Sequence, residues 1–135
     1  AQFLSMRLHS RWMKEQPASI HATGGASANK DLLQVAADVF QVPVKVHEIT
    51  DSAAMGASLR SVYSHFWQSE SPMSWLSLTE KVLSHQFYDI IRPNEEYAEL
   101  YDDLLALYLE CEQFALGSGK HPEECRKKFV EKYFL

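Results

Sequence analysis

The sequence predicts an α/β protein, and three neighbouring patterns carry that prediction. A short β-branched and apolar run over 20–23 ends in the adjacent glycines Gly24 and Gly25. Apolar side chains then recur at helical spacing over 30–40, and residues 42–47 alternate between valine and other residue types. Strand, helix and strand in this order predict a βαβ unit, whose two strands are parallel and joined by a right-handed crossover.

The glycine pair allows two interpretations. Without a Cβ, Gly24 and Gly25 let a flat or phosphorylated ligand approach the main chain closely. The helix that follows then offers free N–H groups and a small positive charge at its start. Alternatively, the pair is only a tight turn from strand to helix. Ser27 or Asn29 is expected to cap the helix through a side-chain oxygen.

The helix over 30–40 is expected to lie on the sheet through a single apolar stripe. Gln41 and Pro43 end it, and the strand over 42–47 follows directly. The residues of the expected stripe are Leu32, Val35, Ala36, Val39 and Phe40.

Five further helices are predicted from apolar residues at helical spacing. They cover 1–14, 53–65, 75–83, 94–116 and 122–134, and Asn94 is expected to cap the longest of them. The side chains expected to pack the last two are Tyr97, Tyr101, Leu104, Leu105, Tyr108, Phe129, Val130 and Tyr133.

Small residues follow one side of the helix over 53–65. Ala53, Gly56 and Ala57 recur there at helical spacing. A glycine inside a helix costs about 1 kcal/mol relative to alanine, so its missing side chain predicts a close neighbour. That neighbour is either a partner helix or the sheet of the same domain, and the residues alone leave both open.

Composition bounds the class of protein. A chain of 135 residues with 46% hydrophobic content forms one domain with a substantial core. Its net charge of −5 and pI near 5.6 argue against nucleic acid or an anionic membrane as the main partner. No membrane span or signal peptide is recognisable. The distant Cys111 and Cys125 suit reduced thiols, so we expect a cytoplasmic protein.

No catalytic constellation is recognisable. The six histidines occur singly, and neither a nucleophile elbow nor a Walker loop is present. Gly24-Gly25 does not fit the dinucleotide pattern G-x-G-x-x-G. If the turn binds a nucleotide, the chemistry must therefore come from residues outside this chain. The sequence also starts without methionine, inside a helical pattern, so we expect it to be part of a longer protein.

Two segments carry a resemblance to a known family. The segment 22–40, ATGGASANKDLLQVAADVF, and the segment 51–60, DSAAMGASLR, closely resemble the C-terminal domain of carbohydrate kinases of the FGGY family. The resemblance is strong over 20–62 and fainter over 93–98 and the long helix. Within the family it is greatest to xylulose kinases of the eukaryotic type.

The resemblance implies an actin-like, ribonuclease-H-like ATPase fold, of which this chain is the last βαβ unit with the C-terminal helices. Residues 1–135 would then be the C-terminal part of the family's adenosine-binding domain, with the N-terminal domain absent. It implies that the Gly25 backbone lies against adenosine and that Asn29 hydrogen-bonds the adenine edge. Gly24 and Ser27 would shape the turn.

The same resemblance favours one of the two interpretations of the small residues. Ala53, Gly56 and Ala57 match a family helix that meets a partner helix across the hinge between domains. The implied role of these three residues is therefore hinge packing.

The implied activity is transfer of the γ-phosphate of ATP to D-xylulose, giving ADP and D-xylulose 5-phosphate. The family's Asp-Gly-Thr phosphate segment, its sugar-binding residues and its catalytic aspartate precede the matched part, and Mg²⁺ is held mainly there. The chain alone is therefore expected to be inactive. Two alternatives stay open: a glycerol, ribulose or gluconate kinase of the same family, or a non-catalytic nucleotide-binding or assembly module.

In such a fold, strands 20–23 and 42–47 are the last two of five. Without the other three, the outer edge of 20–23 would be unpaired. We also expect Leu8, Trp12 and Met55 to be exposed, and such surface normally finds a partner. The isolated chain is therefore expected to self-associate, either by edge pairing of 20–23 or by exchange of the first helix.

Overall fold

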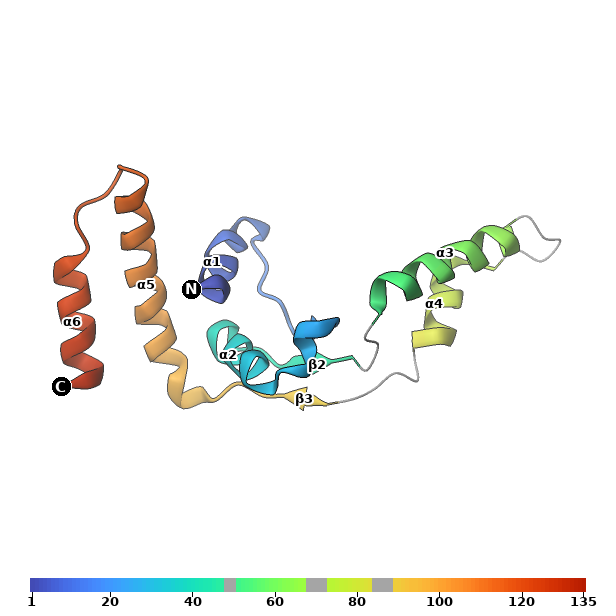
Figure 1. Ribbon diagram of the computed structural model, residues 1–135, viewed down its shortest axis with the longest axis horizontal. Coiled ribbons are helices and arrows are strands. Elements are labelled where there is room, and N and C mark those ends of the chain that lie inside the picture. Colours follow the sequence, from blue (N-terminus) through green and yellow to red (C-terminus); the bar gives the residue numbers. More distant parts are fainter. Residues whose placement is uncertain (48–50, 68–72, 84–88) are drawn as a thin grey trace.

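The computed structural model describes residues 1–47, 51–67, 73–83 and 89–135 (Figure 1). Residues 1–47 and 89–135 form a body, from which residues 51–67 and 73–83 project as an arm. The elements of the body are α1 (Gln2–His9), β1 (Ile20–Ala22), α2 (Lys30–Phe40), β2 (Val44–Val46), β3 (Ile90–Ile91), α5 (Ala98–Ala115) and α6 (Glu123–Phe134), and those of the arm are α3 (Ser52–Trp67) and α4 (Trp75–Leu83).

The sheet confirms the parallel strand pair and adds a third strand. β1 pairs with β2 in parallel, with Ile20 opposite Val44, and β2 pairs with β3 in antiparallel, with Val44 opposite Ile91. The order is β1-β2-β3, so β2 is central. The sequence did not predict β3, because two residues are too few to show a strand periodicity.

Helix α2 has the predicted bounds, and its buried face agrees with the expected stripe only in part. Ala36 and Val39 are buried as expected, whereas Leu32 and Val35 are 38% and 40% exposed. Leu33 and Ala37 are buried instead, against the sheet. The expectation of one stripe was wrong because α2 has two neighbours: its sheet-facing side meets the strands, while Val39 meets α1 and α5.

A second cluster joins the helices of the body. Leu4 of α1, Val39 of α2 and Leu105 of α5 are buried together. Leu8 packs on the same cluster and is half-buried, so its expected exposure was wrong. Trp12 is 78% exposed, as expected. The first helix is shorter than 1–14, because α1 ends at His9 and a 3₁₀ turn follows.

The buried carboxylate of Asp38 links α2 to the segment before α5. Asp38 is 4% exposed, and burial of a charge is unfavourable unless hydrogen bonds compensate it. Its Oδ1 accepts hydrogen bonds from Gln34 Nε2 at 2.9 Å and from the Asn94 backbone N at 2.7 Å. Asn94 in turn caps the next turn, because its side chain accepts from the Glu96 N at 3.1 Å.

Polar contacts hold α6 against α5. Lys132 Nζ lies 2.6 Å from Glu99 Oε1 and 2.7 Å from Asp103 Oδ2, and the hydrogen bond that it donates to Asp103 is the main reason that the pKa of Lys132 is raised. Two side chains expected to pack here do not, since Tyr97 and Val130 are 47% and 39% exposed. Among the described residues, no helix is long and apolar enough to cross a membrane.

Candidate functional site

The glycine turn follows β1 and depends on glycine at its first position. Gly24 has φ 83° and ψ −173°, a combination that essentially only glycine adopts. A 3₁₀ turn over Gly25–Ala28 comes next. Ser27 closes this turn twice, because its backbone N and its Oγ both donate to the Gly24 carbonyl oxygen, at 3.0 and 2.6 Å.

Gly25 presents bare backbone to an open hollow. It is exposed, and a Cβ built on it would meet no atom of the described structure within 4 Å. The hollow beside it measures about 580 Å³ and is lined by Gly25, Ala28, Asn29, Lys30 and Asp31. The backbone of Gly25 is therefore open to close approach by a flat group, and binding of a ligand there stays a prediction.

Asn29 serves as the N-cap of α2. Its Oδ1 accepts a hydrogen bond from the Leu32 backbone N at 3.1 Å. Within the described residues its Nδ2 has no partner, so this amide nitrogen is available to a ligand at the rim of the hollow. One side chain can thus support the helix through its oxygen and donate to an acceptor through its nitrogen.

The charges at the rim favour an uncharged ligand group. Lys30 Nζ lies 2.6 Å from Asp89 Oδ2, and this hydrogen bond raises the pKa of Lys30 and lowers that of Asp89. The lysine charge is thereby balanced, and Asp31 adds a negative charge in the first turn of α2. The hollow therefore suits a nucleoside better than its phosphate groups.

Two contacts near the turn were not predicted. His21 Nδ1 and His47 Nε2 lie 2.8 Å apart, although the sequence presents both as single histidines. Burial, then the charges of His21 and Lys45, lower the pKa of His47. In addition, Thr23 Oγ1 lies 2.9 Å from Ser52 Oγ, which connects the end of β1 to the start of α3. The parallel pairing of β1 and β2 brings the two histidines together, and local sequence patterns reveal neither contact.

The small residues of α3 face solvent. Ala53, Gly56 and Ala57 are all exposed, and a Cβ on Gly56 would meet no described atom within 4 Å. The alternative in which this helix crowds against its own sheet is therefore wrong. Packing against a partner helix stays a prediction. Nor do the described residues contain a group of three or more side chains able to hold a metal ion.

A comparison with protein families decides the classification. Residues 1–65 match the C-terminal domain of the FGGY family of carbohydrate kinases. This part of the chain belongs to that family. It includes α1, α2, the strand pair β1–β2, the glycine turn and most of α3, so every residue that lines the hollow beside Gly25 lies inside the matched segment.

Individual proteins of the family extend the similarity. A xylulose kinase of Rattus norvegicus is 35% identical over 127 residues, which is 91% of this chain and 23% of that protein. Xylulose kinase 2 of Arabidopsis thaliana is 43% identical over 68 residues, 49% of this chain and 12% of that protein. A glycerol kinase of Nitratidesulfovibrio vulgaris (strain DP4) is 40% identical over 58 residues, 42% of this chain and 12% of that protein.

A solved structure confirms the fold class. The ligand-bound xylulose kinase from Lactobacillus acidophilus matches with a TM-score of 0.66 and 22% sequence identity. The match covers 86% of this chain and 23% of that one. The predicted α/β fold, a portion of an actin-like ATPase domain, is therefore correct. The chain spans about a quarter of the length of these longer FGGY relatives.

Proposed function

We propose that this chain is the adenosine-binding portion of a xylulose kinase. The complete protein would transfer the γ-phosphate of ATP to D-xylulose, giving ADP and D-xylulose 5-phosphate. The observation that carries the proposal is the bare backbone of Gly25 beside an open hollow, within a segment that belongs to the FGGY family. Similarity to xylulose kinases over most of the chain supports the choice of sugar.

The proposed roles divide between backbone and side chains. Gly25 would lie against the adenosine, and Asn29 Nδ2 would donate to a ring nitrogen of adenine while Oδ1 keeps its cap on α2. Gly24 and Ser27 hold the turn that exposes this backbone. Mg²⁺, the sugar and the catalytic base would be held by other parts of the protein, so residues 1–135 alone would have no kinase activity.

A second candidate keeps the family and changes the substrate. Glycerol kinases are 40% identical to this chain over 58 residues, and the glycine turn alone does not distinguish polyols from sugars. Turnover of D-xylulose, glycerol, ribulose and gluconate by the full-length protein separates the two. Preference for glycerol would replace xylulose kinase by glycerol kinase while leaving the adenosine site as proposed.

Substitution of Gly25 tests the adenosine site. In the full-length protein, Gly25→Val is expected to abolish ATP binding measured by calorimetry, because the side chain would fill the space proposed for adenosine. The melting temperature should stay within a few degrees, since the new Cβ meets no protein atom. Ala115→Val, at an exposed position at the end of α5, is the matched control. Unchanged ATP affinity in Gly25→Val would refute the site.

Substitution of Asn29 separates its two roles. Asn29→Ala would remove the helix cap as well as the adenine contact, and loss of a cap costs about 1 kcal/mol of stability. Asn29→Asp retains an oxygen for the Leu32 N, loses the donor and adds a negative charge that the start of a helix tolerates well. We expect it to keep the melting temperature and to weaken ATP binding by about 1–2 kcal/mol. ATP affinity equal to that of the unsubstituted protein would contradict the adenine contact.

A further inference from the structure

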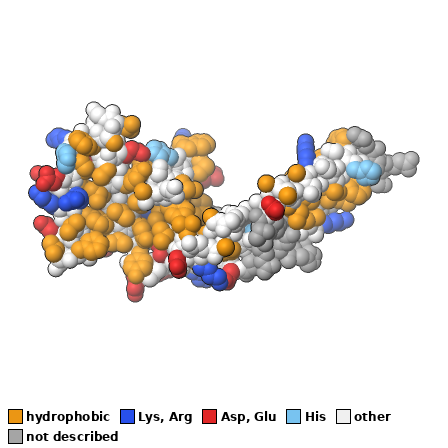
Figure 2. Space-filling view, viewed as in Figure 1, with side chains coloured by type: hydrophobic (Ala, Val, Ile, Leu, Met, Phe, Trp, Pro, Cys, Tyr) orange, Lys and Arg blue, Asp and Glu red, His pale blue; other side chains and the backbone are white. Residues whose placement is uncertain are grey.

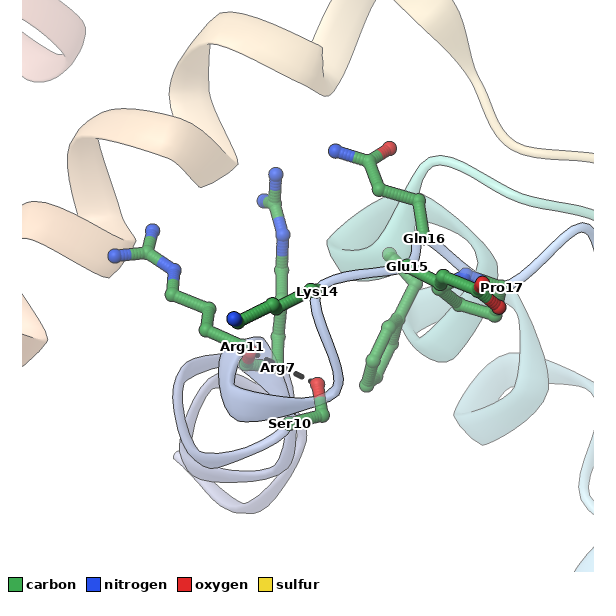
Figure 3. Close-up of a pocket in the computed structure, with 8 residues that line it drawn as sticks. Arg7, Ser10, Arg11, Lys14, Glu15, Gln16 and Pro17 are labelled. Atoms are coloured by element: carbon green, nitrogen blue, oxygen red, sulfur yellow. Dashed lines mark hydrogen bonds between the residues drawn. The ribbon is translucent and has the colours of Figure 1, made fainter.

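A second hollow lies at the opposite end of α2 from the glycine turn. It measures about 290 Å³ and is formed by the end of α1, the loop over 14–17 and Phe40, the last residue of α2 (Figure 3). An 11-residue helix is about 16 Å long. The hollow is therefore separate from the one beside Gly25, which borders the first turn of α2.

Three cationic residues line this hollow in a protein whose net charge is −5. Arg7 Nη2 is paired with Asp102 Oδ1 at 2.7 Å, yet its Nη1 is buried without a hydrogen-bond partner. Arg11 and Lys14 have no carboxylate partner among the described residues, although acidic groups are abundant in the chain. The wall therefore carries positive charge that the described part of the protein does not balance.

The backbone brings two of these cations together. Lys14 has φ 59° and ψ −1°, a left-handed conformation that is uncommon and unfavourable for a residue with a Cβ. It turns the chain after the 3₁₀ segment, where the Lys14 N donates to the Arg11 carbonyl oxygen at 3.2 Å, and both residues line the hollow (Figure 3). The only carboxylate that lines the described hollow, that of Glu15, lies across the loop beside Pro17.

The rest of the wall suits an organic group. Phe40 offers an apolar ring, and Ser10 and Gln16 offer polar side chains. The volume of the hollow, about 290 Å³, is roughly ten times the 30 Å³ that one water molecule takes up in the liquid. The hollow therefore has room for an organic group in addition to an anion. A phosphomonoester carries a charge of about −1.5 to −2 at neutral pH, which matches the two unpaired cations better than a single carboxylate does.

We propose that this hollow binds a small phosphomonoester, with its phosphate group on Arg11 and Lys14 and its organic group against Phe40. Guanidinium groups bind phosphate oxygens through paired hydrogen bonds, and lysine adds a compact charge. The site does not depend on the proposed kinase activity, since it shares no residue with the glycine turn.

Calorimetry with ribose 5-phosphate, inorganic phosphate and ribose at 0.15 M salt tests the site on the 135-residue chain. We expect saturable binding of ribose 5-phosphate, binding of inorganic phosphate at least about tenfold weaker, and none of ribose. In amide NMR spectra, ribose 5-phosphate should shift signals of 7–16 and Phe40 and leave those of 24–31 unchanged. Equal affinity for inorganic phosphate, or shifts confined to 24–31, would overturn the assignment.

A double substitution provides the decisive comparison. Arg11→Gln with Lys14→Gln should weaken ribose 5-phosphate binding by at least about tenfold, because both phosphate partners are lost. Lys120→Gln with Arg126→Gln removes the same charges from exposed positions around the start of α6 and should have no effect. Both pairs are exposed, so both proteins should fold. Equal weakening by the two pairs, or no saturable binding to the unsubstituted chain, would refute the site.

Discussion

The body and the arm use their apolar side chains differently. In the body, α2 lies between the sheet and two helices, and Val39, Val44 and Leu105 are at most 2% exposed. In the arm, α3 and α4 contact each other, and only Leu59 and Leu78 are buried among its described residues. Figure 2 shows apolar atoms gathered along the arm as well as over the body.

This difference in burial shows that the body has a hydrophobic core and that the described part of the arm does not enclose one of its own. Two helices packed only on each other cannot enclose their large side chains, and Trp67 and Leu76 are 65% and 66% exposed. The guanidinium carbon of Arg60 lies 5.6 Å from the centroid of Tyr63 and 5.9 Å from that of Trp75, and Arg60 is exposed, so these contacts of the arm lie at its surface. The body is therefore expected to carry the stability of the chain, and the arm to provide surface for contacts.

The largest expected effect is on the mass in solution. β1 has only β2 beside it among the described strands, and such an edge is a template for pairing. Light scattering at micromolar concentration should give at least twice the monomer mass of 15.5 kDa. A monomer with a cooperative melt would contradict this.

One substitution separates the two expected routes of association. Ile20 N donates to the Pro43 oxygen and the Ala22 oxygen accepts from His47 N, so the His21 N–H between them faces the free edge. His21→Pro should therefore restore the monomer if strands pair edge to edge. It should leave the mass unchanged if the first helix is exchanged.

Two leucine substitutions compare the regions directly. Leu105→Ala removes a side chain that is 2% exposed in the helical cluster, and we expect a loss of about 2–5 kcal/mol in the free energy of unfolding. Leu76→Ala, the same change at a residue that is 66% exposed in the arm, should change it by less than about 0.5 kcal/mol. Chemical denaturation measures both. Similar losses would show that the arm shares the core of the body.

The buried carboxylate of the body should give a smaller effect. Asp38→Ala leaves the Asn94 N without its acceptor and removes one of the two acceptors of the Gln34 amide, which keeps the Arg92 carbonyl oxygen, so we expect a loss of about 1–3 kcal/mol. Asp38→Asn keeps an oxygen at the same place and should lose less. Glu110→Ala on the exposed side of α5 is the control and should be nearly neutral. If Asp38→Ala were as mild as Glu110→Ala, Asp38 would not hold the two segments together.

The smallest expected effect is a dependence on pH at the sheet. The pKa of His47 lies below its ordinary value of 6.5, so the unfolded chain takes up a proton before the folded one as pH falls. His47 therefore adds stability above pH 6.5 that is lost as pH falls through its folded pKa. The melting temperature should decrease between pH 7.5 and 5.5, and less so in His47→Gln than in the matched His65→Gln. Equal decreases in both variants would contradict the role of His47.

The sequence predicted those features of the fold that depend on residues close together in the chain, such as helix caps and helix bounds. The Asn29 cap and the break at Gln41 set the bounds of α2, and helical spacing located α4 and α5. The sequence missed the part of the buried face of α2 formed by Leu33 and Ala37, the strand β3 and the His21–His47 contact. Each of these depends on which distant segment lies opposite, and that information is not present in the periodicity of any one segment.

The place where the arm leaves the body has a consequence for protein engineering. The Val46 N, at the end of β2, donates to the Asp89 oxygen, immediately before β3, at 2.9 Å. The chain therefore leaves the sheet and returns to it at neighbouring points, so the arm is an insertion between the paired strands β2 and β3. Since closing a loop costs only about 0.6 kcal/mol more for each doubling of its length, this junction can accept a short turn, a reporter domain or a longer arm while β2 and β3 stay paired.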